Sequence, residues 1–151
     1  MRVCVVGCGA VGSLFAAHLA QADGVEVWAY DVVRPHVDAI NRDGLRLTGE
    51  ADLVASVRAT SDSSEIPPCE FGIVATKSLY TRTAIEAAAH AFKDGAVASV
   101  QNGVGNEEVI AEHVERVIRG TTFPAGRVLE PGVVHMDTRG DTWLGPFVPR
   151  P

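Results

Sequence analysis

Short apolar runs alternate with amphipathic segments along most of the chain. Residues 2–6 form a β-branched apolar run, and residues 10–21 carry apolar side chains at helical spacing. The same alternation recurs downstream, with turn residues between the segments. The expected strands are 2–6, 25–30, 71–75, 96–100 and 116–121, and the expected helices are 10–21, 34–42, 79–92 and 107–114. Strands that alternate with helices predict an α/β fold with a mainly parallel sheet covered on both faces.

Two segments depart from this alternation. Residues 45–60 alternate apolar and polar side chains, which predicts one or two short strands or an excursion from the sheet. Residues 122–145 are strand-like throughout and predict antiparallel strands appended at the C-terminal end of the sheet. Residues 146–151 are expected to begin a linker. We therefore expect one domain over residues 1–151, with its core at about residues 1–121.

A glycine-rich turn joins the first expected strand to the first expected helix. Gly7, Gly9 and Gly12 have the spacing GxGxxG, in which the glycines allow a tight turn, close approach of a pyrophosphate, and close packing of helix on strand. The free N–H groups and the dipole of the helix N-terminus favour an anion. A glycine-rich turn without a ligand is the alternative. The context favours a Rossmann-type, doubly wound fold in which the pyrophosphate of a dinucleotide is bound by Gly7, Cys8, Gly9, Ala10, Val11 and Gly12.

Asp31 ends the second expected strand, 19 positions after Gly12. A carboxylate there would accept hydrogen bonds from the ribose hydroxyls and repel a 2′-phosphate, which favours NAD. Arg34, three residues further on, could pair with that phosphate and favour NADP. Asp31 could instead only cap the turn that follows the strand. The cofactor is thus predicted to be NAD or NADP.

Lys77 and Asn102 follow two further expected strands. At the start of a helix the dipole disfavours a cation such as Lys77 by about 0.3–1 kcal/mol, which a bound dinucleotide or carboxylate would offset. An exposed lysine that bends towards water is the alternative. A helix follows Asn102-Gly103, so a hairpin turn there loses its main support. Because parallel strands end at one edge of a sheet, Lys77, Asn102, Asp31 and the glycine turn are expected to converge.

The composition narrows the kind of partner. With 46% hydrophobic residues, 151 residues suffice for one core, and the net charge of −6 with scattered basic residues argues against nucleic acid or an anionic membrane. The sequence contains no transmembrane span, so a small-molecule partner is expected. The three cysteines and five histidines lack the spacing of metal sites, which predicts no metal, a reducing cytoplasmic setting and surface histidines. Cys8 either fits the turn as a small residue or is a redox-sensitive thiol at a helix N-terminus.

These features together resemble the ketopantoate reductases (2-dehydropantoate 2-reductases) over essentially the whole chain. The resemblance rests on the opening VCVVGCGAVGSLFAAHLA, the DGLRL segment, the lysine in VATKSLYT, the QNGVGNEE segment, and the tail GTTFPAGRVLEPGVVH with a closing WLG. It implies pantothenate biosynthesis, with hydride from the nicotinamide reducing the ketone of 2-dehydropantoate to (R)-pantoate. It also implies that Lys77 and Asn102 lie near the nicotinamide ribose and substrate, and that the loop around Ala125 and Gly126 touches the cofactor.

The sequence departs from the family pattern in two ways, and each adds an alternative function. The family usually has an arginine near the position of Asp31, so an NAD-dependent 2-hydroxy-acid dehydrogenase of the D-mandelate type is an alternative. Members of the family also continue into a helical domain that supplies the proton-donating lysine, which this chain lacks. We therefore expect cofactor binding with little or no turnover, and a surface that could support a homo-oligomer. A non-catalytic dinucleotide-binding module is a further alternative, whereas a flavin or S-adenosylmethionine binder has no specific support.

Overall fold

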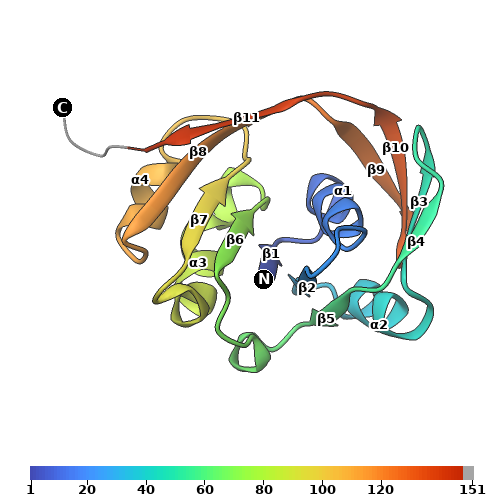
Figure 1. Ribbon diagram of the computed structural model, residues 1–151, viewed down its shortest axis with the longest axis horizontal. Coiled ribbons are helices and arrows are strands. Elements are labelled where there is room, and N and C mark those ends of the chain that lie inside the picture. The colour runs from blue at the N-terminus through green and yellow to red at the C-terminus, as the bar shows by residue number, and fades with distance from the viewer. Residues whose placement is uncertain (148–151) are drawn as a thin grey trace.

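A seven-stranded sheet with the strand order β11-β8-β7-β6-β1-β2-β5 runs through the middle of the computed structural model, which describes residues 1–147 (Figure 1). Its neighbouring strands are parallel, except that β11 is antiparallel to β8. The expected mainly parallel sheet, with an antiparallel strand added near the C-terminal end, is confirmed. The strands are β1 (Arg2–Val6), β2 (Glu26–Tyr30), β5 (Arg58–Thr60), β6 (Phe71–Val74), β7 (Ala96–Ser99), β8 (Arg116–Thr122) and β11 (Thr142–Pro146).

Helices cover both faces of this sheet, as a doubly wound fold requires. Helix α1 (Ala10–Leu19) lies on one face, α3 (Thr81–Ala88) and α4 (Asn106–Ala111) lie on the other, and α2 (Arg34–Asp43) packs near β5 (Figure 1). The helix expected over residues 79–92 is not continuous, because short 3₁₀ turns at Ser78–Tyr80 and Ala89–Phe92 flank α3. Such tighter turns are common where α-helices begin and end.

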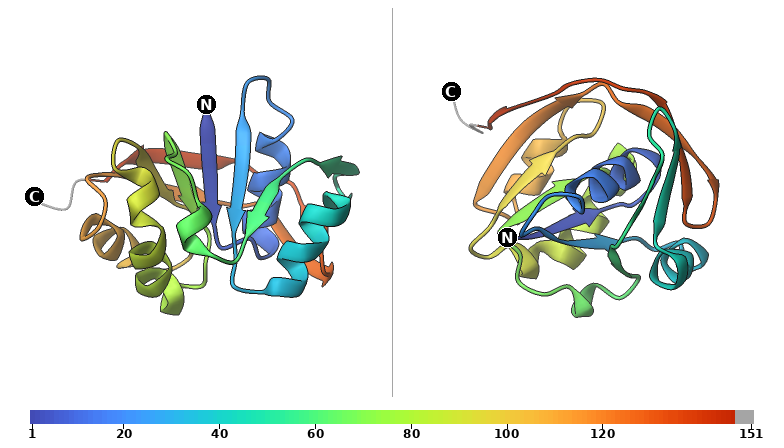
Figure 2. Two further views of the ribbon diagram at one scale, coloured as in Figure 1. Left: turned by 90° about the horizontal axis from the view of Figure 1, so that it is seen from below. Right: turned by 45° about the vertical axis from the view of Figure 1, so that its right-hand side comes forward.

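A second sheet, of four strands, covers the outer side of α1 (Figures 1 and 2). Its order is β4-β3-β10-β9, and β10 runs parallel to β3 and antiparallel to β9. Of the strands expected in the tail, β11 joins the main sheet, whereas β10 pairs with β3 in the excursion after α2 and β9 pairs with β10. The strands are β3 (Leu45–Gly49), β4 (Leu53–Ala55), β9 (Ala125–Glu130) and β10 (Val133–Thr138).

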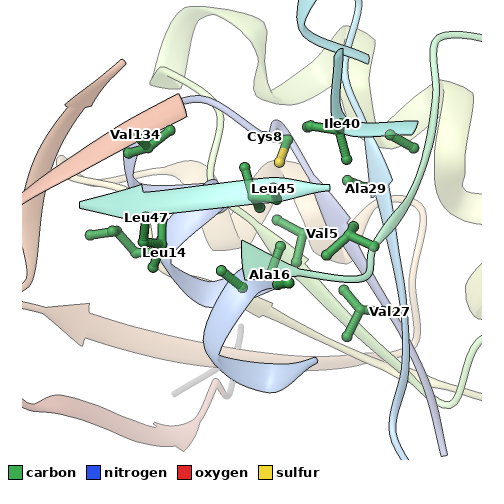
Figure 3. Close-up of a cluster of buried hydrophobic side chains, with 14 of the residues drawn as sticks. Val5, Cys8, Leu14, Ala16, Val27, Ala29, Ile40, Leu45, Leu47 and Val134 are labelled. Carbon is green, nitrogen blue, oxygen red and sulfur yellow. The ribbon is translucent and has the colours of Figure 1, made fainter. Parts of the chain in front are cut away.

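The second sheet has a physical reason to exist, because α1 presents apolar residues on more than one side. Leu14 of α1 belongs to a buried cluster that includes Val5 of β1 on one side and Leu47 and Val134 of the second sheet on the other (Figure 3). A separate cluster on the opposite face of the main sheet includes Cys4 of β1 and residues of α3 and α4. Successive residues of β1 thus enter different cores, as the strand period of two requires.

The C-terminal segment differs in one detail from the expectation. Pro146 is the last residue of β11, so the strand extends into the segment 146–151 that was expected to begin a linker. Residues 148–151 lie outside the described residues. No helix in the described part, residues 1–147, has both the length and the apolar character needed to cross a membrane.

Candidate functional site

The loops that follow β1, β2, β6 and β7 meet at one edge of the main sheet. The strand register pairs Val6 with Tyr30 and Val74, and pairs Val74 with Ser99, so these four strands end at the same level. Strand β1 is also where the chain turns to opposite sides of the sheet, and ligands of open α/β sheets bind beyond such a switch point. The structure brings to this edge the glycine turn, Asp31, Lys77 and Asn102.

Each glycine of the turn meets a different requirement. Gly7 has φ +89°, and a Cβ there would lie 2.6 Å from Cγ2 of Thr76, so both its conformation and its surroundings favour glycine. A Cβ at Gly12 would overlap with the carbonyl oxygen of Gly7, which explains how α1 approaches β1 so closely. A Cβ at Gly9 would meet nothing within 4 Å. The turn is therefore closed on its protein side and open at Gly9.

The N-terminus of α1 is suited to hold an anion. Gly9 is the N-cap residue and provides no side-chain hydrogen bond, and the first turn contains no acidic residue. The first N–H groups of a helix lack partners within the helix and carry the positive end of its dipole. Backbone N–H groups beside an open glycine fit the pyrophosphate of a dinucleotide.

The carboxylate of Asp31 joins the end of β2 to the glycine turn. One oxygen accepts a hydrogen bond from the backbone N–H of Cys8 at 2.8 Å, and the other accepts from the N–H of Val33 at 2.9 Å. The turn-capping role, given above as the alternative to ribose binding, is thus observed. Each carboxylate oxygen has a second lone pair, so the same side chain can still accept from a ribose hydroxyl.

Arg34 is exposed at the first residue of α2, close to the end of β2. The pKa of the Asp62 carboxyl lies below its usual range, mainly because Ser64 donates hydrogen bonds to it and in smaller part because of the positive charge of Arg34. Arg34 and Asp62 are therefore close enough for their charges to interact.

Lys77 and Asn102 are both exposed on neighbouring loops. Lys77 precedes the 3₁₀ turn Ser78–Tyr80, and the hydroxyl of Ser78 donates to the backbone carbonyl of Asn102 at 2.7 Å. Asn102 also lines a groove of about 290 Å³ between its loop and β8. In the same groove, the buried carboxylate of Glu107 lies 3.5 Å from the guanidinium of Arg119.

Ala125 and Gly126 begin β9 in the second sheet. A Cβ at Gly126 would lie 2.6 Å from the carbonyl oxygen of His135 and 3.5 Å from Cδ1 of Leu14. This segment therefore lies against the second turn of α1, one turn beyond the glycines.

Two residues near the glycine turn have roles that the sequence reasoning left open or missed. Burial raises the pKa of the Cys8 thiol to about 12, which contradicts a redox-sensitive thiol and supports a small residue that fits the turn. His36 is buried rather than on the surface, and its Nδ1 accepts from the N–H of Gly132 at 3.0 Å. The spacing of His36 with Val37 and Ile40 along α2 could have indicated this burial.

Metal ligands do not gather at this edge. Within residues 1–147, no three or more His, Cys, Asp or Glu side chains lie close enough together to hold a metal ion. The donor groups of the edge are mainly backbone N–H groups, one ammonium and one amide, a set that suits an anionic organic ligand.

Comparisons with known proteins agree with this geometry. Residues 3–149 match the family described as ketopantoate reductase PanE/ApbA. The 2-dehydropantoate 2-reductase of Pyrococcus abyssi is 40% identical over 146 residues, which cover 96% of this chain and 47% of that protein. The enzyme of the same name from Halobacterium salinarum is 32% identical, covering 97% of this chain and 50% of that protein.

Solved structures show the same likeness. A PanE/ApbA family ketopantoate reductase from Ralstonia eutropha JMP134 superposes with a TM-score of 0.87 at 33% identity, covering 95% of this chain and 49% of that one. A D-mandelate dehydrogenase with NADH and anilino(oxo)acetate superposes with a TM-score of 0.83 at 25% identity, covering 95% and 47%. The chain thus spans about half the length of these relatives. From the family match over nearly the whole chain, this protein belongs to the ketopantoate reductase family.

Proposed function

We propose that this chain is the cofactor-binding part of an NAD(P)H-dependent reductase that converts 2-dehydropantoate to (R)-pantoate. The observation that carries the proposal is the open, uncapped N-terminus of α1 at the switch point, with Lys77 and Asn102 at the same edge. Membership of the ketopantoate reductase family supports the choice of substrate.

The proposal gives each part of the edge a task. Residues 7–12 bind the pyrophosphate, Asp31 or Arg34 binds the adenosine ribose or its phosphate, and Ala125 and Gly126 touch the cofactor. The ammonium of Lys77 and the amide of Asn102 bind the nicotinamide ribose and the substrate. The nicotinamide, when bound, supplies the hydride.

Turnover needs a further group, because hydride transfer leaves negative charge on the substrate oxygen and a proton must reach it. By resemblance to the family, that proton comes from a lysine of a helical domain outside residues 1–151. We therefore propose that this chain alone binds cofactor with little or no turnover. An exposed aromatic pair supports packing of a further domain on this chain. Phe123 and Trp143 are 56% and 62% exposed, and their ring centroids lie 5.5 Å apart in an edge-to-face arrangement. The same apolar surface would support a homo-oligomer.

A second candidate is an NAD-dependent 2-hydroxy-acid dehydrogenase of the D-mandelate type. Asp31 favours it, because a carboxylate at the end of β2 would repel the 2′-phosphate of NADP. The similar D-mandelate dehydrogenase structure carries NADH. Its substrate would be a branched or aromatic 2-oxo acid.

Calorimetric titration of the chain with NADH and NADPH in parallel tests the proposal. We expect NADH to bind about tenfold more tightly, a difference of about 1.4 kcal/mol, because Asp31 lies beside the glycine turn. Asp31→Ala should abolish this preference, whereas Arg34→Ala should leave it; this result would support cofactor binding at this edge and favour NADH as the cofactor, as in the second candidate. If NADPH binds more tightly and Arg34→Ala weakens it, the phosphate is bound by Arg34 and reduction of 2-dehydropantoate with NADPH is favoured. Failure to bind either dinucleotide would contradict cofactor binding, and turnover of 2-dehydropantoate by the chain alone would contradict the need for a further domain.

A further inference from the structure

A buried amide connects the loops that carry Lys77 and Asn102. Nε2 of Gln101 lies 2.9 Å from the carbonyl oxygen of Thr76, 3.0 Å from its hydroxyl, and 2.8 Å from the hydroxyl of Thr81. Gln101 is only 9% exposed. Because Thr76 directly precedes Lys77 and Gln101 directly precedes Asn102, this side chain joins the backbone next to both residues.

A second buried amide, that of Asn106, joins the same loops from the start of α4. Its Nδ2 donates to the carbonyl of Asn102 at 3.1 Å and to the hydroxyl of Ser78 at 3.2 Å. Its Oδ1 accepts from the hydroxyl of Thr81 at 2.9 Å. Asn106 is 3% exposed, so these are contacts inside the protein. The carbonyl of Asn102 therefore accepts from two side chains, Asn106 and Ser78.

The two amides contribute little to the regular structure around them. The N-cap of α4 is Gly105, and no side chain at this position caps the helix. Gln101 lies beyond the end of β7. A buried amide destabilises the folded state unless its donors and acceptors are satisfied, so burying two at one place requires the matched hydrogen bonds seen here. Their contacts fall on the two loops that carry the exposed residues Lys77 and Asn102.

We propose that Gln101 and Asn106 are positioning residues that hold Lys77 and Asn102 in one fixed relation for the nicotinamide half of the cofactor. The inference rests on the proposed function. Neither amide touches the ligand; each acts through the backbone of the neighbouring loops. Binding groups on two separate loops are effective only when their relative position is fixed to within about 0.5 Å. The network supplies that constraint before the cofactor arrives.

The first test compares a whole dinucleotide with its adenosine diphosphate half. For Gln101→Ala and Asn106→Ala, we expect NADH and NADPH to bind about tenfold more weakly, while ADP binds within about twofold of the unchanged chain. Asn41→Ala is the control, because the amide of Asn41, although the residue is exposed, forms two hydrogen bonds with the backbone of Ala59 at α2 and β5, away from both loops. An equal loss for dinucleotide and ADP, or no loss for either, would overturn the positioning role.

The second test needs no ligand. Hydrogen exchange of the free protein should rise together in residues 77–80 and 102–105 of Asn106→Ala, and in neither segment of Asn41→Ala. A rise in only one segment would show that the amides do not couple the loops. Ser78→Ala removes one exposed hydroxyl from the network, so it keeps the test available if Asn106→Ala does not fold. For this variant we expect dinucleotide affinity to fall about threefold and exchange in both segments to rise about threefold. If the unchanged chain binds no dinucleotide, the proposed function fails and the positioning role fails with it. If the unchanged chain binds dinucleotide, but the variants lose dinucleotide and ADP affinity equally or lose neither, the positioning role fails and the proposed function stands.

Discussion

The two halves of the proposed ligand-binding edge keep their shape by different means. In the glycine half, residues 7–12 and 31–34, the geometry comes from the backbone, because Gly7 and Gly12 leave no room for a side chain. In the amide half, residues 76–81 and 101–106, the geometry comes from side-chain hydrogen bonds of Gln101 and Asn106. A side-chain atom added at Gly7 or Gly12 should therefore disrupt the glycine half, whereas the loss of a hydrogen bond should disrupt the amide half.

The largest effect is expected for Gly12→Ala. The new Cβ would overlap with the carbonyl oxygen of Gly7 and lie 3.2 Å from Cγ1 of Val5, so α1 must move away from β1. We expect the free energy of unfolding to fall by about 3 kcal/mol or more, measured by urea denaturation.

Gly9→Ala is the matched control, because its Cβ would meet no protein atom within 4 Å. Its stability should change by about 1 kcal/mol or less, while dinucleotide affinity falls because the methyl group occupies the open side of the turn. Equal destabilisation by the two substitutions would contradict the assignment of a packing role to Gly12 alone.

An intermediate effect is expected in the amide half for Thr81→Val. The hydroxyl of Thr81 donates to Asn106 and accepts from Gln101, and valine has the same shape without it. We expect the unfolding free energy to fall by about 1–2 kcal/mol, because a buried amide oxygen loses its donor. Thr81→Ser keeps the hydroxyl and should retain the hydrogen bonds. A Thr81→Val protein as stable as the unchanged chain would show that these hydrogen bonds do not stabilise the fold.

The smallest effect is expected for the thiol of Cys8, in the glycine half. Burial raises its pKa from the ordinary value of 9.0 to about 12, so the folded state keeps the proton where the unfolded state loses it. The stability that this protonated thiol contributes is present below pH 9.0 and is lost as pH rises towards 12. Near pH 8, iodoacetamide should leave Cys8 unmodified in the folded protein and label it after denaturation, as mass spectrometry of its peptide would show. Rapid labelling in the folded protein would contradict the burial.

The same comparison explains what the sequence could predict. The glycine half was predictable because a left-handed φ at Gly7 and the close packing at Gly12 can be met only by glycine, at a fixed spacing. For the amide half, the sequence predicted the positions of Lys77 and Asn102 but not the buried network beneath them. Glutamine and asparagine are common surface residues, so Gln101 and Asn106 gave no sign of burial. Their burial beneath the loops depends on how three separate segments meet, and local sequence does not encode that.

The sheet arrangement follows the same division. Strand positions in the parallel core were readable from apolar runs bounded by turns. The partner of β10 was not readable, because a strand with one buried face can join either sheet, and the choice here depends on covering the outer side of α1. The partner of His36 was not readable for a related reason, since Gly132 belongs to the distant turn between β9 and β10.

The pairing of β3 with β10 has a consequence for how the molecule folds. Thr48 and His135, which pair across these strands, are separated by 87 positions in the sequence. Contacts between such distant segments form late, because the entropy of closing a long loop must be overcome first. During synthesis, the outer cover of α1 cannot assemble until β10 has left the ribosome. The helix that presents the glycine turn therefore reaches its final environment near the end of folding, and apolar side chains of α1 stay accessible to chaperones until then.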